Sequence, residues 1–215
     1  MDNTTNLPHT PGQPPPVHPA PQWVCIDFAN TVEWRLSENP NDRMIGYDKL
    51  LAWGERTGLL EPEVAESLRR EAMLRPGEAQ QAFADAVELR EAIYRVMFGV
   101  ANGMPRDPGG VALLYRGVAD ALRHRTLVDG PEGFVWDWPG EETDLDSVTH
   151  KVALSASDLL TSPEVHRLKA CPGDGCGWLF VDTSRTGNRR WCDMEICGNR
   201  AKVRRHREAA RQMHS

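Results

Sequence analysis

Four cysteines in the last quarter of the chain limit what it can fold into more than any other feature. They form two Cys-x4-Cys pairs separated by fifteen residues, first Cys171 and Cys176, then Cys192 and Cys197. Two short loops that each offer two thiolates match the tetrahedral coordination of zinc, and four thiolates leave no position for water. The spacing therefore predicts a structural rather than a catalytic zinc ion. Disulfide bonds are the alternative, but nothing else in the chain is typical of a secreted protein.

The residues that follow each pair predict a small hairpin and a helix. Residues 178–181 are rich in aromatic and β-branched side chains, residues 183–188 have turn composition, and residues 189–191 would return as the second strand. After Cys197, residues 200–212 contain neither Pro nor Gly, which predicts a helix. Together with the first cysteine pair, this order resembles a treble-clef zinc finger.

A finger of this size buries little apolar surface of its own. Metal binding would therefore supply much of its folding free energy. We expect removal of the metal to unfold it. Its expected small core consists of Trp178, Phe180, Trp191 and Val203.

The end of the chain is basic although the protein as a whole is acidic. From Thr183 onward the sequence has nine Lys or Arg against three Asp or Glu, a net charge of +6, which leaves −12 on the rest of the chain. In the predicted helix, arginines recur at intervals of four, three and four residues and would share one face. These are Arg200, Arg204, Arg207 and Arg211. Such segregation favours a polyanion as partner, because phosphate contacts release counterions.

The positive charge of this segment could also serve a purpose other than binding a polyanion. A zinc ion with four thiolates carries a formal charge of about −2, and nearby arginines would neutralise it. The remaining positive charge could clamp the acidic part of the same chain or bind a second protein. Nucleic acid is the interpretation that the charge pattern favours.

The residues around the second cysteine pair resemble a known family. Residues 197–200 read Cys-Gly-Asn-Arg, preceded by Arg-Arg-Trp-Cys at 189–192, and look like the CGNR zinc finger of bacterial proteins. Upstream, residues 26–31, 51–53 and 89–92, together with His150, are similar to the ABATE domain that precedes this finger. The family is described as stress-induced transcription regulators, so the resemblance implies a regulator without enzymatic activity.

The resemblance also assigns residues. It implies that Cys171, Cys176, Cys192 and Cys197 bind the metal, and that Arg189, Arg190, Asn199, Arg200, Lys202 and Arg204 form the basic motif. The charge pattern adds Arg185, Arg207 and Arg211 to the residues that would contact DNA. Which of them would specify a DNA sequence does not follow from the chain alone.

The expected fold is mainly α (α+β), with a helical domain, a small β-hairpin and the finger. Helices are expected in five segments: 48–58, 62–75, 82–100, 111–122 and 144–160, and Asp48 would cap the first. The third would bury the face of Ala82, Ala86, Leu89, Ile93, Val96 and Val100, and the fourth that of Val111, Leu114, Val118 and Leu122. Residues 126–128 and 134–138 would pair as a hairpin. Residues 23–30 form a short apolar run that fits either a strand or a turn of helix. We expect boundaries at 1–21, 22–165 and 166–215.

The first 21 residues contain seven prolines and almost no large apolar side chain. Such a segment cannot bury enough surface to offset its ordering entropy, which predicts a disordered tail. It lacks the pattern of a signal peptide, and no apolar run is long enough to cross a bilayer. A cytoplasmic protein with no membrane partner is the expectation.

Five residues of the helical domain are candidates for a ligand pocket: Asp27, Asn30, Thr31, Trp53 and Arg90. They are polar or aromatic groups in apolar surroundings. In one hypothesis Arg90 grips a small anionic ligand beside the Trp53 ring. In the other, Asp27 and Arg90 form a structural pair, because buried charges need partners.

The favoured function is therefore a zinc-containing, DNA-binding transcription regulator. Its helical domain would sense a small ligand or form a homodimer. The alternatives are a protein-interaction module with structural zinc and, less favoured, a small-ligand enzyme. The chain has no Gly-rich phosphate loop and no nucleophile or zinc-protease motif. His124, His150 and His166 are too scattered along the sequence to assign a catalytic base.

Overall fold

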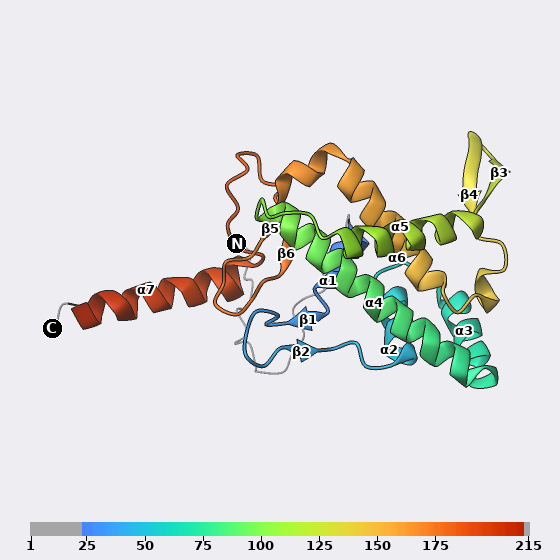
Figure 1. Cartoon of the computed structure of the whole chain (residues 1–215), viewed down its shortest axis with the longest axis horizontal. Helices are drawn as coiled ribbons and strands as arrows, with labels where there is room; N and C mark the ends of the chain where they lie inside the picture. The colour runs from blue at the N-terminus through green and yellow to red at the C-terminus, as the bar shows by residue number, and fades with distance from the viewer. Residues whose placement is uncertain (1–22, 213–215) are drawn as a thin grey trace, which may run out of the picture.

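The computed structural model of the chain describes residues 23–212 (Figure 1). The expected tail at residues 1–21 lies outside this range. The described chain is mainly helical with three two-stranded antiparallel sheets, as predicted. The helices are α1 (Val24–Ala29), α2 (Tyr47–Arg56), α3 (Pro62–Leu74), α4 (Pro76–Ala101), α5 (Pro108–Arg123), α6 (Ser147–Thr161) and α7 (Asn199–Gln212). The strands are β1 (Val32–Glu33), β2 (Asn41–Asp42), β3 (Thr126–Gly130), β4 (Gly133–Asp137), β5 (Leu168–Ala170) and β6 (Leu179–Val181).

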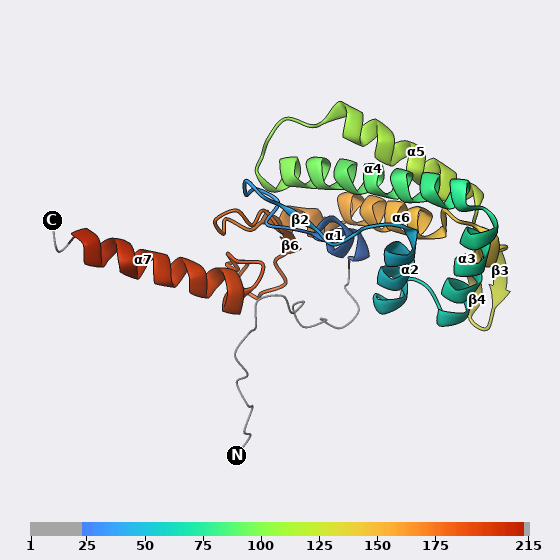
Figure 2. The same ribbon diagram turned by 90° about the horizontal axis from the view of Figure 1, so that it is seen from below.

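Helix α4 is the centre of the helical body. The helices α1, α5 and α6 pack against it, and Figures 1 and 2 show it running the length of the body. Its predicted apolar face is correct, because residues spaced by three or four positions are buried. These are Ala82, Ala86, Leu89, Ile93 and Val96.

Two helices differ from the sequence-based prediction. Asp48 does not cap α2, because Gly46 precedes that helix and Asp48 lies in its first turn, where a carboxylate favours the helix dipole. On α5, Leu114 is buried as expected, whereas Val111 and Leu122 are about half exposed. Helix α5 lies on the outside of α4 and therefore covers it with a narrower face than the spacing predicts.

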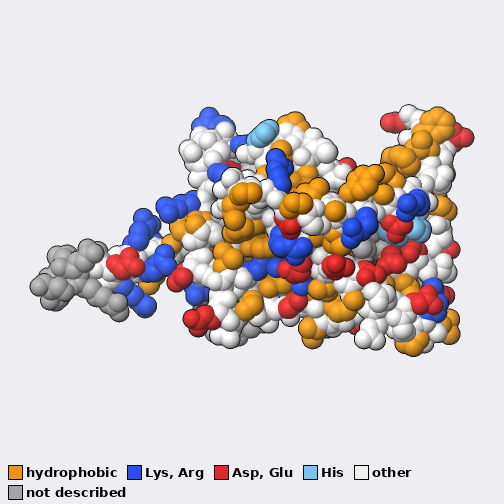
Figure 3. Space-filling view, in the orientation of Figure 1, with side chains coloured by type: hydrophobic (Ala, Val, Ile, Leu, Met, Phe, Trp, Pro, Cys, Tyr) orange, Lys and Arg blue, Asp and Glu red, His pale blue; other side chains and the backbone are white. Residues whose placement is uncertain are grey.

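The hairpin of β3 and β4 has the predicted position. It stands out from the body at the end opposite α7 (Figure 1). Its apolar side chains face solvent, and Phe134 is 72% exposed. Figure 3 shows this apolar surface as the orange projection.

The prediction for the second hairpin has the wrong partner strand. Strand β6 forms as expected, but it pairs with β5, which precedes the first cysteine, and not with residues 189–191. The first cysteine pair therefore sits in the loop of this hairpin. Leu168, Leu179 and Val181 join the core of the helical body, whereas Val203, expected in the finger core, is about half exposed.

Candidate metal centre

The four cysteine sulfurs lie at distances that suit a tetrahedral zinc ion. The Sγ atoms of Cys176 and Cys192 are 3.7 Å apart, as are those of Cys192 and Cys197, and all four sulfurs lie within 4.8 Å of one another. Zinc–sulfur bonds of about 2.3 Å in a tetrahedron place the sulfurs about 3.8 Å apart. A disulfide needs a separation of about 2.05 Å. The donor set therefore fits a structural zinc ion.

The first cysteine pair is held by backbone hydrogen bonds. Cys171 N donates to Trp178 O at 2.7 Å, and Cys176 N donates to Gly173 O at 2.8 Å. A Cβ atom at Gly173 would lie only 3.0 Å from the Cys197 sulfur and 3.4 Å from the Cys171 sulfur. The loop between the first two cysteines is thus shaped to pass close to the centre of the sulfur cluster.

The second pair leads directly into α7. Cys197 lies in the turn Met194–Gly198, where the Asp193 side chain accepts a hydrogen bond from Ile196 N at 2.8 Å. Helix α7 begins at the residue after this turn. Cys197 therefore lies two residues before the helix rather than within its first turn. A zinc ion bound here would fix the origin of α7.

Crowding sets the ionisation of the thiols. Hydrogen bonds from Cys192 and Cys197 to the neighbouring sulfurs, chiefly that of Cys171, raise the pKa of both thiols. The Cys171 sulfur accepts hydrogen bonds first from Cys176 and then from Cys192 and Cys197, and these lower the pKa of its thiol. Four thiolates so close together repel one another strongly, and a divalent cation removes that repulsion.

Two family models match the sequence. A model described as "CGNR zinc finger" matches residues 167–210. The ABATE model, described as "Putative stress-induced transcription regulator", matches residues 23–163, well over half of the chain. The chain belongs to the ABATE family. No curated protein matches it at a significant level.

The two matches confirm the resemblance found in the sequence. An ABATE domain followed by a CGNR finger with four clustered cysteines makes this protein a zinc-binding regulator. Neither family is described as a family of enzymes. Within residues 23–212, none of the helices combines the length and the apolar character needed to span a bilayer.

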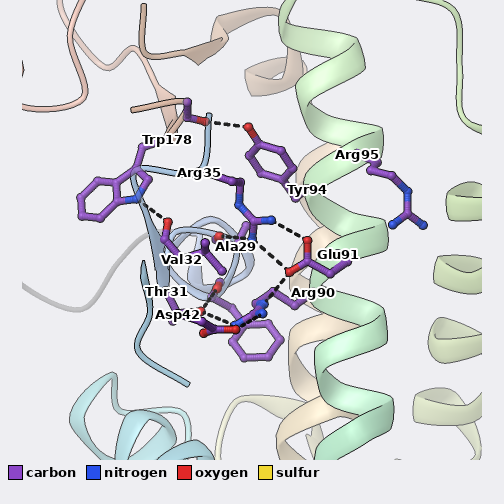
Figure 4. A network of polar contacts seen from close by, with 12 residues as sticks. Ala29, Thr31, Val32, Arg35, Asp42, Arg90, Glu91, Tyr94, Arg95 and Trp178 are labelled. Carbon is purple, nitrogen blue, oxygen red and sulfur yellow. Dashed lines mark hydrogen bonds and ion pairs between the residues drawn. The ribbon is translucent and has the colours of Figure 1, made fainter. Parts of the chain in front are cut away.

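In the ABATE domain, the predicted pair of Asp27 with Arg90 is wrong. Asp27 instead accepts a hydrogen bond from Trp53 Nε1 at 2.7 Å. Arg90 is 2% exposed and binds Asp42 through two hydrogen bonds of 2.6 and 2.8 Å (Figure 4). It also donates to Thr31 Oγ1 at 3.1 Å. No sequence pattern indicates Asp42 as the partner, because it lies 48 residues away on the short strand β2.

These contacts bear on the predicted ligand pocket. With its guanidinium engaged by Asp42 and Thr31, Arg90 would bind a small anion only after Asp42 had moved away. Asn30 does not face a pocket, because its amide pairs with both backbone groups of Leu179 at 2.8 and 2.9 Å. A pocket formed by these residues stays a prediction.

Arg35 is a junction residue that no sequence pattern reveals. Its guanidinium pairs with Glu91, donates to Ala29 O at 2.9 Å and lies 4.0 Å above the Tyr94 ring (Figure 4). Hydrogen bonds from Arg35 outweigh the effect of burial and lower the pKa of Glu91. Nothing in the sequence distinguishes Arg35 from the exposed arginines of the chain, so this role could not be predicted.

The segment around Arg35 joins the ABATE domain to the finger. Arg35 N donates to Cys176 O at 3.1 Å, and Leu36 N donates to Gly175 O at 3.0 Å. Trp178 Nε1 donates to Val32 O at 2.9 Å (Figure 4). These hydrogen bonds therefore join the first cysteine loop to the ABATE domain.

The basic loop after β6 is held by a buried carboxylate. Asp182 is fully buried and accepts from Lys169 Nζ at 2.6 Å, from Ser184 and from Arg189 N at 2.8 Å. The hydrogen bond from Lys169 is the main reason why the pKa of Asp182 is lowered. Arg189 donates from its side chain to the carbonyls of Trp191 and Cys192. Arg189 thus supports the second cysteine pair.

The predicted nucleic-acid residues fall into two groups. Some are exposed and make no side-chain hydrogen bond or ion pair with the described chain, whereas others already contact the finger or Trp34. The first group is Arg185, Arg190 with its stacking on Trp191, Asn199, Lys202 and Arg207. In the second, Arg200 lies 4.3 Å above the Trp34 ring and Arg204 pairs with Asp174 at 3.2 Å. The Arg211 side chain lies outside the part that the structure describes.

Trp34 connects the two domains at a groove. It has a left-handed backbone with φ of 51°, the only such non-glycine residue in the described range. The groove has a volume of about 600 Å³ and lies between α7 and the first cysteine loop. Trp34 and Asp174 line one side, and Arg200, Arg204 and Arg207 line the other.

Proposed function

We propose that this zinc-binding regulator binds DNA, with α7 and the loop at residues 183–190 as the contacting surface. The observation that carries the proposal is the separation of charge in space. The basic end of the chain, with its net charge of +6, includes a helix that projects from an otherwise acidic body (Figures 1 and 2). Lys and Arg side chains lie along this helix in Figure 3.

The geometry argues against an internal clamp. Within the described residues, one ion pair joins α7 to the rest of the chain, between Arg204 and Asp174, and Asp174 belongs to the finger. Among the side chains that the structure describes, no acidic group of the ABATE domain pairs with the helix. The surplus positive charge therefore faces solvent, where a polyanion can approach it.

The zinc centre gives the two basic elements a common support. Cys197 lies two residues before the start of α7, and Cys192 lies two residues after the end of the basic loop. We expect Arg185, Arg190, Lys202 and Arg207 to make the main phosphate contacts, since they are exposed. Asn199, Arg189, Arg200, Arg204 and Arg211 complete the proposed surface.

For the ABATE domain we propose a regulatory role, through ligand binding or through dimerisation. The hydrogen bonds between residues 32–36 and the first cysteine loop support this proposal, because they give the domain a physical route to the finger. We keep residues 22–165 and 166–215 as the proposed division. A cytoplasmic location fits free thiols that stay available to zinc.

The test is a titration of random-sequence duplex DNA, followed by fluorescence anisotropy at several salt concentrations. Each lost phosphate contact lowers the salt slope by about 0.9. We expect Arg207→Ala to weaken binding and to lower the slope by about one contact. The matched control is Arg116→Ala, because Arg116 is an exposed arginine on α5 and its replacement removes the same charge.

Three outcomes separate the candidate functions. The proposal is supported if zinc removal abolishes DNA binding, Arg207→Ala binds DNA more weakly than wild type, and Arg116→Ala binds it with unchanged affinity. Equal affinity of Arg207→Ala and wild type at every salt concentration would overturn the role of α7. No binding by zinc-loaded protein would favour a protein-interaction module.

A further inference from the structure

Two histidines that are far apart in the sequence are neighbours in the ABATE domain. His124 ends α5 and His150 lies in the first turns of α6, and their rings stack with centroids 4.3 Å apart. Asp120 lies one turn before His124. One ligand atom from each of these three residues falls within 4.8 Å of the others. The expectation that these histidines are scattered is therefore wrong for this pair.

His150 has the surroundings of a metal ligand. Its side chain is 4% exposed, and its Nδ1 atom donates to Asp144 Oδ2 at 3.0 Å. That bond directs the other ring nitrogen, Nε2, toward Asp120 Oδ2 at 3.3 Å. Ligating histidines commonly donate their second nitrogen to a carboxylate, which fixes the ring and raises its basicity.

His124 is held in a similar way. Its Nδ1 atom donates to the backbone oxygen of Asp120 at 3.0 Å, so Nε2 is the nitrogen left for a ligand. The ring is exposed, and the Asp120 side chain is about half exposed. Because the His124 ring is stacked on that of His150, it would have to turn before both rings could point a nitrogen at one ion. Its exposure allows this turn, whereas His150 is fixed by burial.

Charged groups of both signs surround the cluster. Arg123 pairs with Asp120 Oδ1 at 2.8 Å, which leaves Asp120 Oδ2 facing His150. On the other side of His150, Asp144 contributes a second carboxylate.

From this geometry we infer a second metal site, for a divalent transition ion of the zinc or ferrous type. Asp120, His124 and His150 are its ligands, and Asp144 orients His150. Two nitrogens and one carboxylate form a donor set that suits these ions. Ligands about 2.0–2.1 Å from a tetrahedral ion are about 3.3 Å apart, which matches the separation of His150 Nε2 and Asp120. Three protein ligands leave one position open to solvent, unlike the four thiolates of the finger.

The site lies at the base of the β3–β4 hairpin. One residue separates His124 from β3, and Trp138, directly after β4, has its ring nearly parallel to that of His150 at 6.4 Å. An ion at this position would join the end of α5 to the start of α6 beside the hairpin.

The experiment uses the full-length protein with its cysteine site filled by one equivalent of zinc. Cobalt(II) is then added, and binding is followed by its visible d–d absorption, while elemental analysis counts the metal ions per chain. We expect a second ion in wild type, without the thiolate charge-transfer absorption that a cysteine site gives. His124→Ala and Asp120→Asn should each weaken its binding by at least about tenfold.

The matched control is His166→Ala, because His166 is an exposed histidine away from the cluster. It should bind the second ion like wild type. Equal cobalt binding by wild type and His124→Ala, or one ion per chain in wild type, would overturn the site. The cluster would then be a protonated His150 held between Asp120 and Asp144. Unchanged far-ultraviolet circular dichroism shows that each variant is folded, because the ABATE domain is mainly helical.

Discussion

The two halves of the zinc finger are supported in different ways. The inner half, which consists of β5, β6 and the loop with Cys171 and Cys176, shares the core of the ABATE domain through Leu168, Leu179 and Val181. The outer half, which consists of residues 183–198 and α7, has few apolar contacts with that core. Packing against the ABATE domain thus holds the inner half in place, whereas the outer half depends on the metal.

This arrangement also places the zinc ligands on both sides of the division. Two cysteines come from the packed half and two from the exposed half, so a zinc ion would join them. The outer half carries all the residues proposed to contact DNA. A bound metal would therefore fix the position of that surface relative to the ABATE domain.

The largest expected effect comes from zinc removal. A chelator should unfold the outer half and lower the affinity for DNA by at least about tenfold, since the basic residues lose their common support. The ABATE domain and the β5–β6 hairpin should stay folded, because their core does not depend on the metal. Circular dichroism and amide hydrogen exchange, read residue by residue, check both statements.

The Cys192→Ser variant tests the same point by removing one zinc ligand, and Cys25→Ser is its control. Cys25 is buried in the helical core and lies outside the sulfur cluster. Exchange that rises equally throughout residues 23–212 after zinc removal would contradict the division into two halves. It would show that the metal holds the whole chain.

A smaller effect is expected at the junction, where Arg90→Met removes the partner of Asp42. Arg90 is 2% exposed but Asp42 is 40% exposed and can be solvated once its partner is gone, so the free energy of unfolding should fall by about 2 kcal/mol. Urea unfolding of the zinc-loaded protein measures it. Arg95→Met is the matched control, because Arg95 is 54% exposed in its pair with Asp107 and should cost less than about 1 kcal/mol. Equal stabilities of the two variants would contradict the role of the Arg90 network.

Asn30→Ala tests the direct link between the inner half and the ABATE domain. The change leaves the buried N–H and C=O groups of Leu179 without their partner and should cost about 2 kcal/mol. We also expect faster loss of zinc to a chelator, because Cys176 lies three residues before Leu179. Asn102→Ala is the control, since Asn102 bonds only within its own helix end. An unchanged zinc release rate would show that the link does not reach the metal.

The smallest effect is a dependence on pH. Burial opposes ionisation of Asp42, but hydrogen bonds from Arg90 outweigh it and lower the pKa of that carboxyl below 3.8. A lowered pKa stabilises the fold above the unfolded value, and the contribution is lost as the pH falls through the folded value. The stability difference between wild type and Asp42→Asn should therefore be constant above about pH 5 and shrink below about pH 4.

Both proteins in this comparison carry the same cysteines, so protonation of the thiols cancels in the difference. Acid unfolding curves at fixed zinc concentration provide the measurement. A difference that grows as the pH falls would contradict the assigned direction of the pKa change.

Local features follow from the sequence far better than long-range pairings do. The periodic apolar positions of α4 and the β3–β4 hairpin are encoded within short windows, and both predictions are correct, although the two strands extend closer to the turn than predicted. The predicted partner of β6 is wrong, because residues 168–170 lie beyond the cysteine loop and carry no strand signal stronger than that of residues 189–191. Similarly, which residues of α5 are buried depends on the helices that pack against it, and the spacing of its apolar residues does not reveal these.

The same limit applies to the sites. The spacing of the four cysteines is itself the pattern of a zinc site, so the metal centre can be predicted from these residues alone. Asp42 as the partner of Arg90, and His124 as the neighbour of His150, depend on how distant elements meet. The structure explains both, since Arg90 on α4 reaches Asp42 on β2, and the end of α5 lies beside the start of α6.

The burial of β5 and β6 in the helical body has a practical consequence for protein engineering. A segment cut at residues 167–210 and grafted onto an unrelated host would turn Leu168, Leu179 and Val181 out to water. The excised piece would need a substitute surface against these three side chains before it could present its arginines in a fixed direction. The boundary of the sequence family is thus not a boundary at which the molecule can be taken apart.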